Sequence, residues 1–367
     1  MAITPSDLSL KTTVDTFLKD ASDLTLRRRL WMALLQNQGR IIANAGAWTT
    51  RWLVYCKEPA VRGSGDGTES VFTPHDGYLE LQVGIAARET TSSIGHMQDQ
   101  INRESPGQRI NLYMDQYKRL TQSMQHDLGK QFYKSGTGTD IAGLNTPLGY
   151  NTCATTDKVA SPNGSYGGKD TDLGDQGGTW STDLAAASRP NATLANDWPY
   201  GIGSSEYDYL APKFINTNCT NWGTGVAGFR QNVAEILSFT NLALRSLTGD
   251  DEVTNLFCMS GDHFSAFQNS TSPQQRAMMP TSPAMRLGFH EVYNWEGAMV
   301  NSDVNCPAGR TYVMNYNNIE LFHVGPKLLQ TQDEFAMVNN AYLFRVLSYL
   351  NMRLNPKFLA YIGDWTA

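Results

Sequence analysis

The segment 104–136, ESPGQRINLYMDQYKRLTQSMQHDLGKQFYKSG, carries the clearest helical pattern of the chain. Ser105 and Gln108 have the spacing of a capping box, and Pro106 stands in the first turn, where its missing N–H costs nothing. At about 1.5 Å per residue, a helix that ends near Gly136 is a rod of about 40 Å, which is long for a globular domain. Its apolar stripe consists of Ile110, Tyr113, Met114, Tyr117, Met124 and Leu128.

Two segments of alternating polarity precede this helix, WTTRWLVYCKEP at 48–59 and YLELQVGIA at 78–86. Alternation at a period of two is typical of half-buried strands, so the pair predicts a long β-hairpin. Its tip, 60–77, contains closely spaced glycines, but no helix follows them, which argues against a phosphate-binding loop. The apolar face of the predicted hairpin carries Trp52, Val54, Leu79, Leu81 and Val83.

The first 47 residues predict a helical arm, because apolar side chains recur at helical spacing on both sides of three consecutive arginines, Arg27, Arg28 and Arg29. These arginines could contact a polyanion. Three consecutive charges point around a helix, however, so a solvated face or a carboxylate partner is the favoured interpretation.

Segment 157–224 differs from the rest in composition, being dense in Gly, Asp, Asn and Ser. Such a stretch indicates an inserted unit or a functional loop. Asp170, Asp172 and Asp175 raise the possibility of a calcium loop, but the spacing of an EF-hand and its terminal glutamate are absent, so no metal site is predicted.

The remainder predicts a mixed α/β arrangement. An amphipathic helix covers 228–249, a short apolar strand and a helix cover 255–270, and a strand covers 287–295. The tail, 336–365, is rich in β-branched and aromatic residues and predicts one long strand that ends at Asn355 and Pro356, followed by a shorter strand.

TYVMNYNNIELFHVG, 311–325, predicts two short strands that turn at Asn317 and Asn318, residue types that tolerate the conformations of tight hairpins. Glu320 and His323 are three positions apart, which places them on opposite faces of a strand. They are therefore not predicted to act together. His323 is expected to be half-buried and hydrogen-bonded to its neighbours.

Composition excludes several classes of function. Charged residues make up 17% of the 367 residues and the net charge is −6, which predicts neither a nucleic-acid groove nor a polybasic membrane contact. No export signal and no apolar run of membrane-spanning length is apparent, so a cytosolic protein is expected. The histidines and cysteines lack metal-ligand spacing, and the common nucleotide-binding and hydrolase motifs are missing. We expect no enzyme activity, no catalytic residues and no cofactor.

The order of these parts resembles that of the major capsid proteins of tailed bacteriophages, whose coat fold is shared with herpesvirus major capsid proteins. IAGLNTP, 141–147, looks like the short turn that follows the long helix in that family. The segment 311–324 resembles the family's late strand pair, and 341–362 resembles its long C-terminal strand.

The resemblance implies an α+β fold with an N-terminal arm, an extended loop, a spine helix, a peripheral domain and an axial domain. The boundaries it implies are 1–47 for the arm, 48–88 for the extended loop, 89–156 for the spine helix and the start of the peripheral domain, 157–224 for a Gly/Asp/Asn-rich insertion or loop region, 225–330 for the axial domain and 331–367 for a return to the peripheral domain.

The function implied is self-assembly, as hexamers and pentamers, into the icosahedral shell of a virion, built in the host cytoplasm. Partners would be further copies, with scaffolding, portal and decoration proteins possible, DNA touched non-specifically at the inner face, and no membrane. The residues expected to contact an adjacent subunit are Trp52, Val54, Leu79, Leu81, Val83, Arg27, Arg28 and Arg29. Another phage structural component, or a β-rich protein that binds or hydrolyses carbohydrate, is the alternative.

Overall fold

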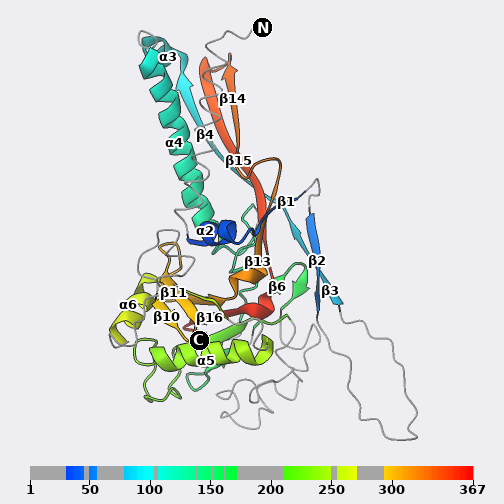
Figure 1. Ribbon diagram of the computed structural model, residues 1–367, viewed down its shortest axis with the longest axis vertical. Coiled ribbons are helices and arrows are strands. Elements are labelled where there is room, and N and C mark those ends of the chain that lie inside the picture. The colour runs from blue at the N-terminus through cyan, green and yellow to red at the C-terminus, as the bar shows by residue number, and fades with distance from the viewer. Residues whose placement is uncertain are drawn as a thin grey trace, which may run out of the picture.

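The structure is a computed structural model, and it describes residues 30–44, 49–55, 78–102, 106–137, 139–150, 152–160, 162–171, 210–248, 254–270 and 293–366. Figure 1 shows an elongated upper part, built from a long helix beside long strands, above a more compact part with a helix below its sheet. The α+β class expected from the sequence is confirmed.

The compact part is built on a seven-stranded mixed sheet in the order β10-β11-β9-β12-β16-β8-β5. Its central strands are buried along their whole length, because an apolar cluster covers each face of the sheet. One of these clusters includes side chains of helices α5 and α6. On β9, for example, Leu256 and Cys258 belong to one cluster and Phe257 to the other. The bounds are β5 Val159–Ala160, β8 Lys213–Asn216, α5 Val233–Thr248, β9 Leu256–Met259, α6 Gly261–Ser270, β10 Tyr293–Trp295, β11 Ala298–Ser302, β12 Thr311–Met314 and β16 Leu359–Gly363.

The elongated part is a five-stranded sheet on which the long helix packs. Strand β15 pairs with β13, β14 and β4, and β1 extends the sheet beyond β13. Phe344 of β15 meets Tyr113 and Tyr117 of the helix edge to face, with ring centroids 5.2 and 5.3 Å apart. The bounds are α2 Leu30–Asn37, β1 Ile41–Asn44, β4 Ala86–Gly95, α3 His96–Asn102, α4 Pro106–Gln131, β13 Ile319–Val324, β14 Gln330–Ala336 and β15 Ala341–Leu354.

The helix α4 begins at the predicted proline and ends at Gln131, a few residues before Gly136. An ion pair between Arg88 of β4 and Asp127 of α4, with nitrogen–oxygen distances of 2.8 and 2.7 Å, joins helix to sheet. The smaller ribbons are β2 Thr49–Tyr55 with β3 Tyr78–Gly84, and β6 Ser165–Tyr166 with β7 Lys169–Asp170.

The predicted hairpin at 311–325 is wrong. Strands β12 and β13 are separated by a 3₁₀ turn, η4 (Tyr316–Asn318), and they belong to different sheets. Neither Asn317 nor Asn318 has a positive φ. The Asn315 side chain instead accepts a hydrogen bond from the Asn317 N–H at 3.0 Å, which caps the turn. The chain therefore passes from β12 into β13 without reversing its direction.

The same connection occurs a second time, in the opposite direction. Strands β15 and β16 are separated by η5 (Pro356–Phe358), and the Asn355 side chain likewise accepts a hydrogen bond from the Lys357 N–H at 3.2 Å. β12 pairs with β16 and β13 pairs with β15 in one continuous antiparallel register, from Thr311↔Ile362 through to His323↔Leu350. The two sheets are therefore joined by one long two-stranded ribbon that is interrupted on both strands at the same level.

Other sequence predictions need correction. Strand β4 was not predicted, because its residues between Ala86 and Ile94 alternate between partial and full exposure and carry polar side chains. Segment 331–367 divides between both sheets instead of returning to one, since β15 and β16 lie on either side of η5. Segment 157–224 supplies core strands at both ends, and residues 172–209, with Asp172 and Asp175, lie outside the described residues.

Candidate functional site

The predicted hairpin forms as β2 and β3, in the register that faces Trp52 toward Leu81. The apolar face of this hairpin is buried within the same chain, however. Val54, Leu81 and Val83 are at most 6% exposed and lie in the chain's own core, so the expectation that they pack on a neighbour is wrong. The reason is the β6–β7 ribbon, whose Gly167 carbonyl accepts a hydrogen bond from the Gln82 N–H at 3.0 Å.

Trp52 and Leu79 are partly buried against the same core. The Trp52 ring meets Tyr166 edge to face at 6.0 Å between centroids. The side chains that project outward are those of the other face: Leu53 is 66% exposed, Tyr78 is 64% exposed, and Arg51 pairs with Glu80 at 3.4 Å. The more exposed face of the hairpin is thus the one that the sequence pattern marked as polar.

The arginines of the arm, Arg27, Arg28 and Arg29, lie outside the described residues. The segment directly after them, α2, is no exposed arm. Residues Trp31 to Leu35 are at most 2% exposed, and the Trp31 ring stacks on Phe132 at 5.9 Å. The Trp31 Nε1–H donates to the Tyr133 hydroxyl at 2.7 Å, which fixes α2 to the end of α4.

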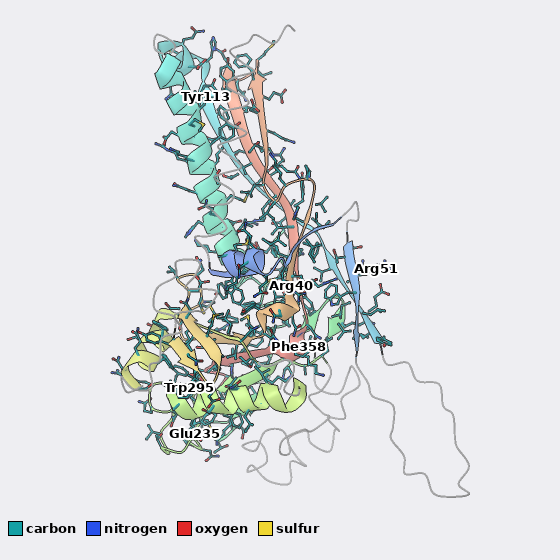
Figure 2. The ribbon with its side chains drawn as sticks, in the orientation of Figure 1. Arg40, Arg51, Tyr113, Glu235, Trp295 and Phe358 are labelled. Carbon is teal, nitrogen blue, oxygen red and sulfur yellow. The ribbon has the colours of Figure 1, made fainter. Side chains whose placement is uncertain are left out.

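A groove of about 490 Å³ opens where β2 passes the two 3₁₀ turns. Its wall combines residues that are far apart in the sequence, and Figure 2 shows Arg40 and Phe358 at this level, with Arg51 on the adjacent strand β2. The groove is lined by Arg40, Trp52, Leu53, Val54, Asn317, Asn318, Glu320, Arg353, Leu354, Asn355, Lys357 and Phe358.

Positive charge predominates in this groove. Glu320, whose side chain is 14% exposed, accepts from Arg40 at 2.9 Å and is also paired with Arg353. The Arg353 guanidinium lies 5.7 Å from the Trp52 ring centroid, a cation–π distance. No carboxylate is found within salt-bridge distance of Lys357 in the described part of the chain, so the lining carries three cations against one anion.

Glu320 therefore has a structural role that the sequence did not reveal. His323 lies on the opposite side of β13, as strand geometry predicts, but it is more buried than expected, at 8%. Its Nδ1 has no hydrogen-bond partner among the described residues, and burial lowers its pKa.

Two other buried polar side chains, those of His263 and Tyr133, are held by internal partners. His263 stacks on Phe229 at 3.9 Å, and its Nδ1 lies 2.8 Å from the Thr311 hydroxyl; desolvation lowers its pKa to about 4. The Tyr133 hydroxyl, which accepts from Trp31, donates to Asp303 at 2.8 Å, and burial raises its pKa. These contacts hold the two side chains in the core.

Within the described ranges, no group of three or more His, Cys, Asp or Glu side chains is arranged to hold a metal ion. The cysteines Cys153, Cys219, Cys258 and Cys306 are free thiols, and desolvation raises the pKa of Cys153 to about 12. Among the helices described, none is both long and apolar enough to span a membrane.

Solved capsid structures share this fold. No family model matches the chain, and no curated protein matches it in sequence. The capsid of a native GTA particle, solved with C5 symmetry, superposes with a TM-score of 0.55 and 12% identity over 91% of this chain and 90% of that one.

Two further capsid structures superpose on this chain with similar TM-scores and coverage. The capsid of an empty GTA particle gives a TM-score of 0.51 at 12% identity, covering 90% of this chain and 96% of that chain. The capsid of cyanophage A-1(L) gives 0.51 at 11% identity, covering 89% and 91%. The chain thus has the fold of tailed-phage capsid proteins over nearly its entire length.

Proposed function

We propose that this protein is the major capsid protein of a tailed bacteriophage, which self-assembles into the icosahedral shell around double-stranded DNA. The observation that carries the proposal is the likeness to capsid structures across about nine-tenths of both chains. A likeness confined to one sheet would not support it.

In this proposal β2 and β3 form the extended loop, α4 is the spine helix, the five-stranded sheet is the core of the peripheral domain, and the seven-stranded sheet with α5 and α6 is the axial domain. Subunits form hexamers and pentamers, in the host cytoplasm, and the product is a virion component. Scaffolding, portal and decoration proteins remain candidate partners, and the shell's inner face meets DNA without sequence preference.

The physical basis of assembly is repeated burial of surface. The folded chain leaves apolar side chains exposed at its surface, among them Leu53 at 66% and Val338 at 98% exposure. At roughly 25 cal/mol per Å² of apolar surface, less the freedom lost on association, each contact is modest. Identical contacts repeated between copies close into rings and shells.

The test is direct. The purified full chain is sized by chromatography and imaged by negative-stain electron microscopy. Closed shells are the expected product. Tubes would favour a tail-tube-like component instead, and small discrete particles under all assembly conditions would overturn the proposal.

A second experiment tests the hairpin as the contact element. Deleting residues 63–67, in the glycine-rich tip, should leave the far-ultraviolet circular dichroism and the urea midpoint of the subunit unchanged and should impair shell formation. Normal shells from the deletion variant would exclude the hairpin tip as an assembly contact while leaving the fold assignment intact.

A further inference from the structure

The groove at the twin 3₁₀ turns carries a net positive charge. Three cationic side chains reach it from separate elements: Arg40 from the segment before β1, Arg353 from β15 and Lys357 from η5. Glu320 neutralises part of this charge and holds both guanidinium groups in place. Arg353 is held on its other side by the Trp52 ring. The ammonium group of Lys357 has no such partner among the described residues and lies 5.9 Å from the Phe358 ring centroid.

The opposite character occurs at the far end of the same sheet. Strand β14 is an edge strand, paired with β15 on one side, and its residues Asp333 and Glu334 are exposed. No ion pair of either carboxylate is found among the described residues. Apolar side chains flank them: Phe335 is 37% exposed, Met337 80% and Val338 98%. We call Asp333–Val338 the acidic tip.

The two surfaces match in more than charge. The groove presents Trp52 and Phe358 inside and Leu53 at its edge, next to its cations. The acidic tip presents apolar side chains next to its carboxylates. Rim charges of complementary sign set the orientation of a contact, while apolar contact supplies area.

These surfaces cannot meet within one chain. Glu334 pairs with Leu343 on β15, and Arg353 lies about ten residues further along the same strand, so the two are about 33 Å apart along the sheet. Figure 1 shows β14 at the far end of the elongated part, away from the turns. A contact between two different patches of identical copies is heterologous, which is the type that generates rings and arrays.

We propose that the groove binds the acidic tip of a second copy of this chain, with Glu334 paired to Lys357 and Arg40. Glu334 lies on the face of the sheet opposite α4, because its partner on β15 is Leu343. Asp333 shares the face of Phe344, which packs on α4, and adds negative charge at the rim of the contact. The proposal rests on the proposed shell function and names one contact that this function requires. A phosphate of packaged nucleic acid has related chemistry, but it would not account for the apolar groups on both surfaces.

The test is a charge exchange in the full chain. Lys357→Glu, and separately the double variant Asp333→Lys with Glu334→Lys, should each raise the protein concentration needed for shell assembly by at least about tenfold. Combining all three substitutions should restore assembly toward the wild-type concentration. Lys327→Glu, which reverses an exposed lysine outside the groove, is the matched control and should change little.

Each result decides a different point. Failure of the wild type to assemble would contradict the proposed function itself. With an assembling wild type, normal assembly of Lys357→Glu, or no restoration in the triple variant, would overturn the groove as the receptor of the acidic tip. So would a Lys357→Glu shell that forms normally and differs only in retaining less DNA, which would indicate a phosphate as the ligand. Equal urea midpoints for all variants ensure that assembly, and not folding, is compared.

Discussion

At the scale of single residues, His263 shows how burial becomes a dependence on pH. Its ring is enclosed by Phe229 and Thr311, and its pKa falls from 6.5 to about 4, with the neighbouring Asp262 acting weakly in the other direction. Between about pH 4 and pH 6.5, His263 is therefore protonated in the unfolded chain and neutral in the folded chain. The stability that depends on the neutral ring is complete above about pH 6.5 and is lost as pH falls toward 4.

We expect His263→Gln to remove this component. The wild type should lose up to about 1.4 kcal/mol of unfolding free energy per pH unit more than the variant does between pH 6.5 and 4. Urea denaturation at a series of pH values measures the difference. Parallel pH curves for the two proteins would show that His263 titrates normally.

The hydroxyl of Tyr133 is a second residue with a clear role, because it connects three elements. It accepts from the Trp31 Nε1–H of α2 and donates to Asp303, which follows β11. Tyr133→Phe leaves the indole N–H buried without its acceptor, and should cost about 1–3 kcal/mol of unfolding free energy. Tyr349→Phe is the control, since no hydrogen bond of the Tyr349 hydroxyl is found among the described residues, and it should cost much less. Equal losses would contradict the connecting role.

At the scale of elements, the turn after α4 shows why a glycine is needed at position 143. In IAGL, 141–144, a Cβ on Gly143 would lie 2.5 Å from the carbonyl oxygens of both Gln131 and Phe132. The Leu144 N–H donates to the Phe132 carbonyl at 2.7 Å, so the chain is drawn against the helix end and cannot move aside.

Gly143→Ala should therefore destabilise the subunit by about 1–3 kcal/mol or more, through strain at the helix end. Gly84→Ala is a matched control, because a Cβ there meets nothing within 4 Å, and its effect should be near zero. The midpoints of urea denaturation compare the two. A tolerated Gly143→Ala would mean that the end of the helix can yield.

Periodicity predicted the elements that alternate or repeat strongly, and it failed where pairing is decided at long range. The helix at α4, the hairpin of β2 and β3 and the strand β15 follow from local patterns. The destination of β13 does not, because a capped 3₁₀ turn and a tight hairpin both favour asparagine, and only the partner strands distinguish them. The buried face of the hairpin was mistaken for an interface for the same reason: β6 and β7, which cover it, come from a distant segment.

The groove was also beyond sequence reasoning. Arg40 precedes Glu320 by 280 positions and Arg353 follows Glu320 by 33, and the three meet because β1, β13 and β15 lie side by side. A sequence signal did exist in the repeated Asn-x-x-x-hydrophobic turns at Asn315 and Asn355, each followed by a strand. Only the register of the paired strands shows that the two turns lie opposite each other in the ribbon.

At the scale of the whole molecule, the continuous ribbon makes the two sheets one mechanical unit. β12 and β13 run from the seven-stranded sheet into the five-stranded sheet, and β16 and β15 return beside them in unbroken register. Two paired segments of the chain therefore cross from one sheet to the other, and each sheet contains one half of this ribbon. Loss of one sheet removes the support for the ends of the other, which favours a single cooperative unfolding transition.

Two large-to-small substitutions test this. Phe344 is 1% exposed beneath α4, and Phe267 of α6 is 0% exposed in the other apolar cluster. Phe344→Ala and Phe267→Ala should therefore each cost about 3–5 kcal/mol of unfolding free energy. Hydrogen exchange on unassembled subunits should show that either substitution lowers the protection of the slowest amides in both β9 and β15 by the same free energy. If Phe344→Ala weakened β15 and left β9 protected as in the wild type, the ribbon would be a flexible connection and the two sheets independent folding units.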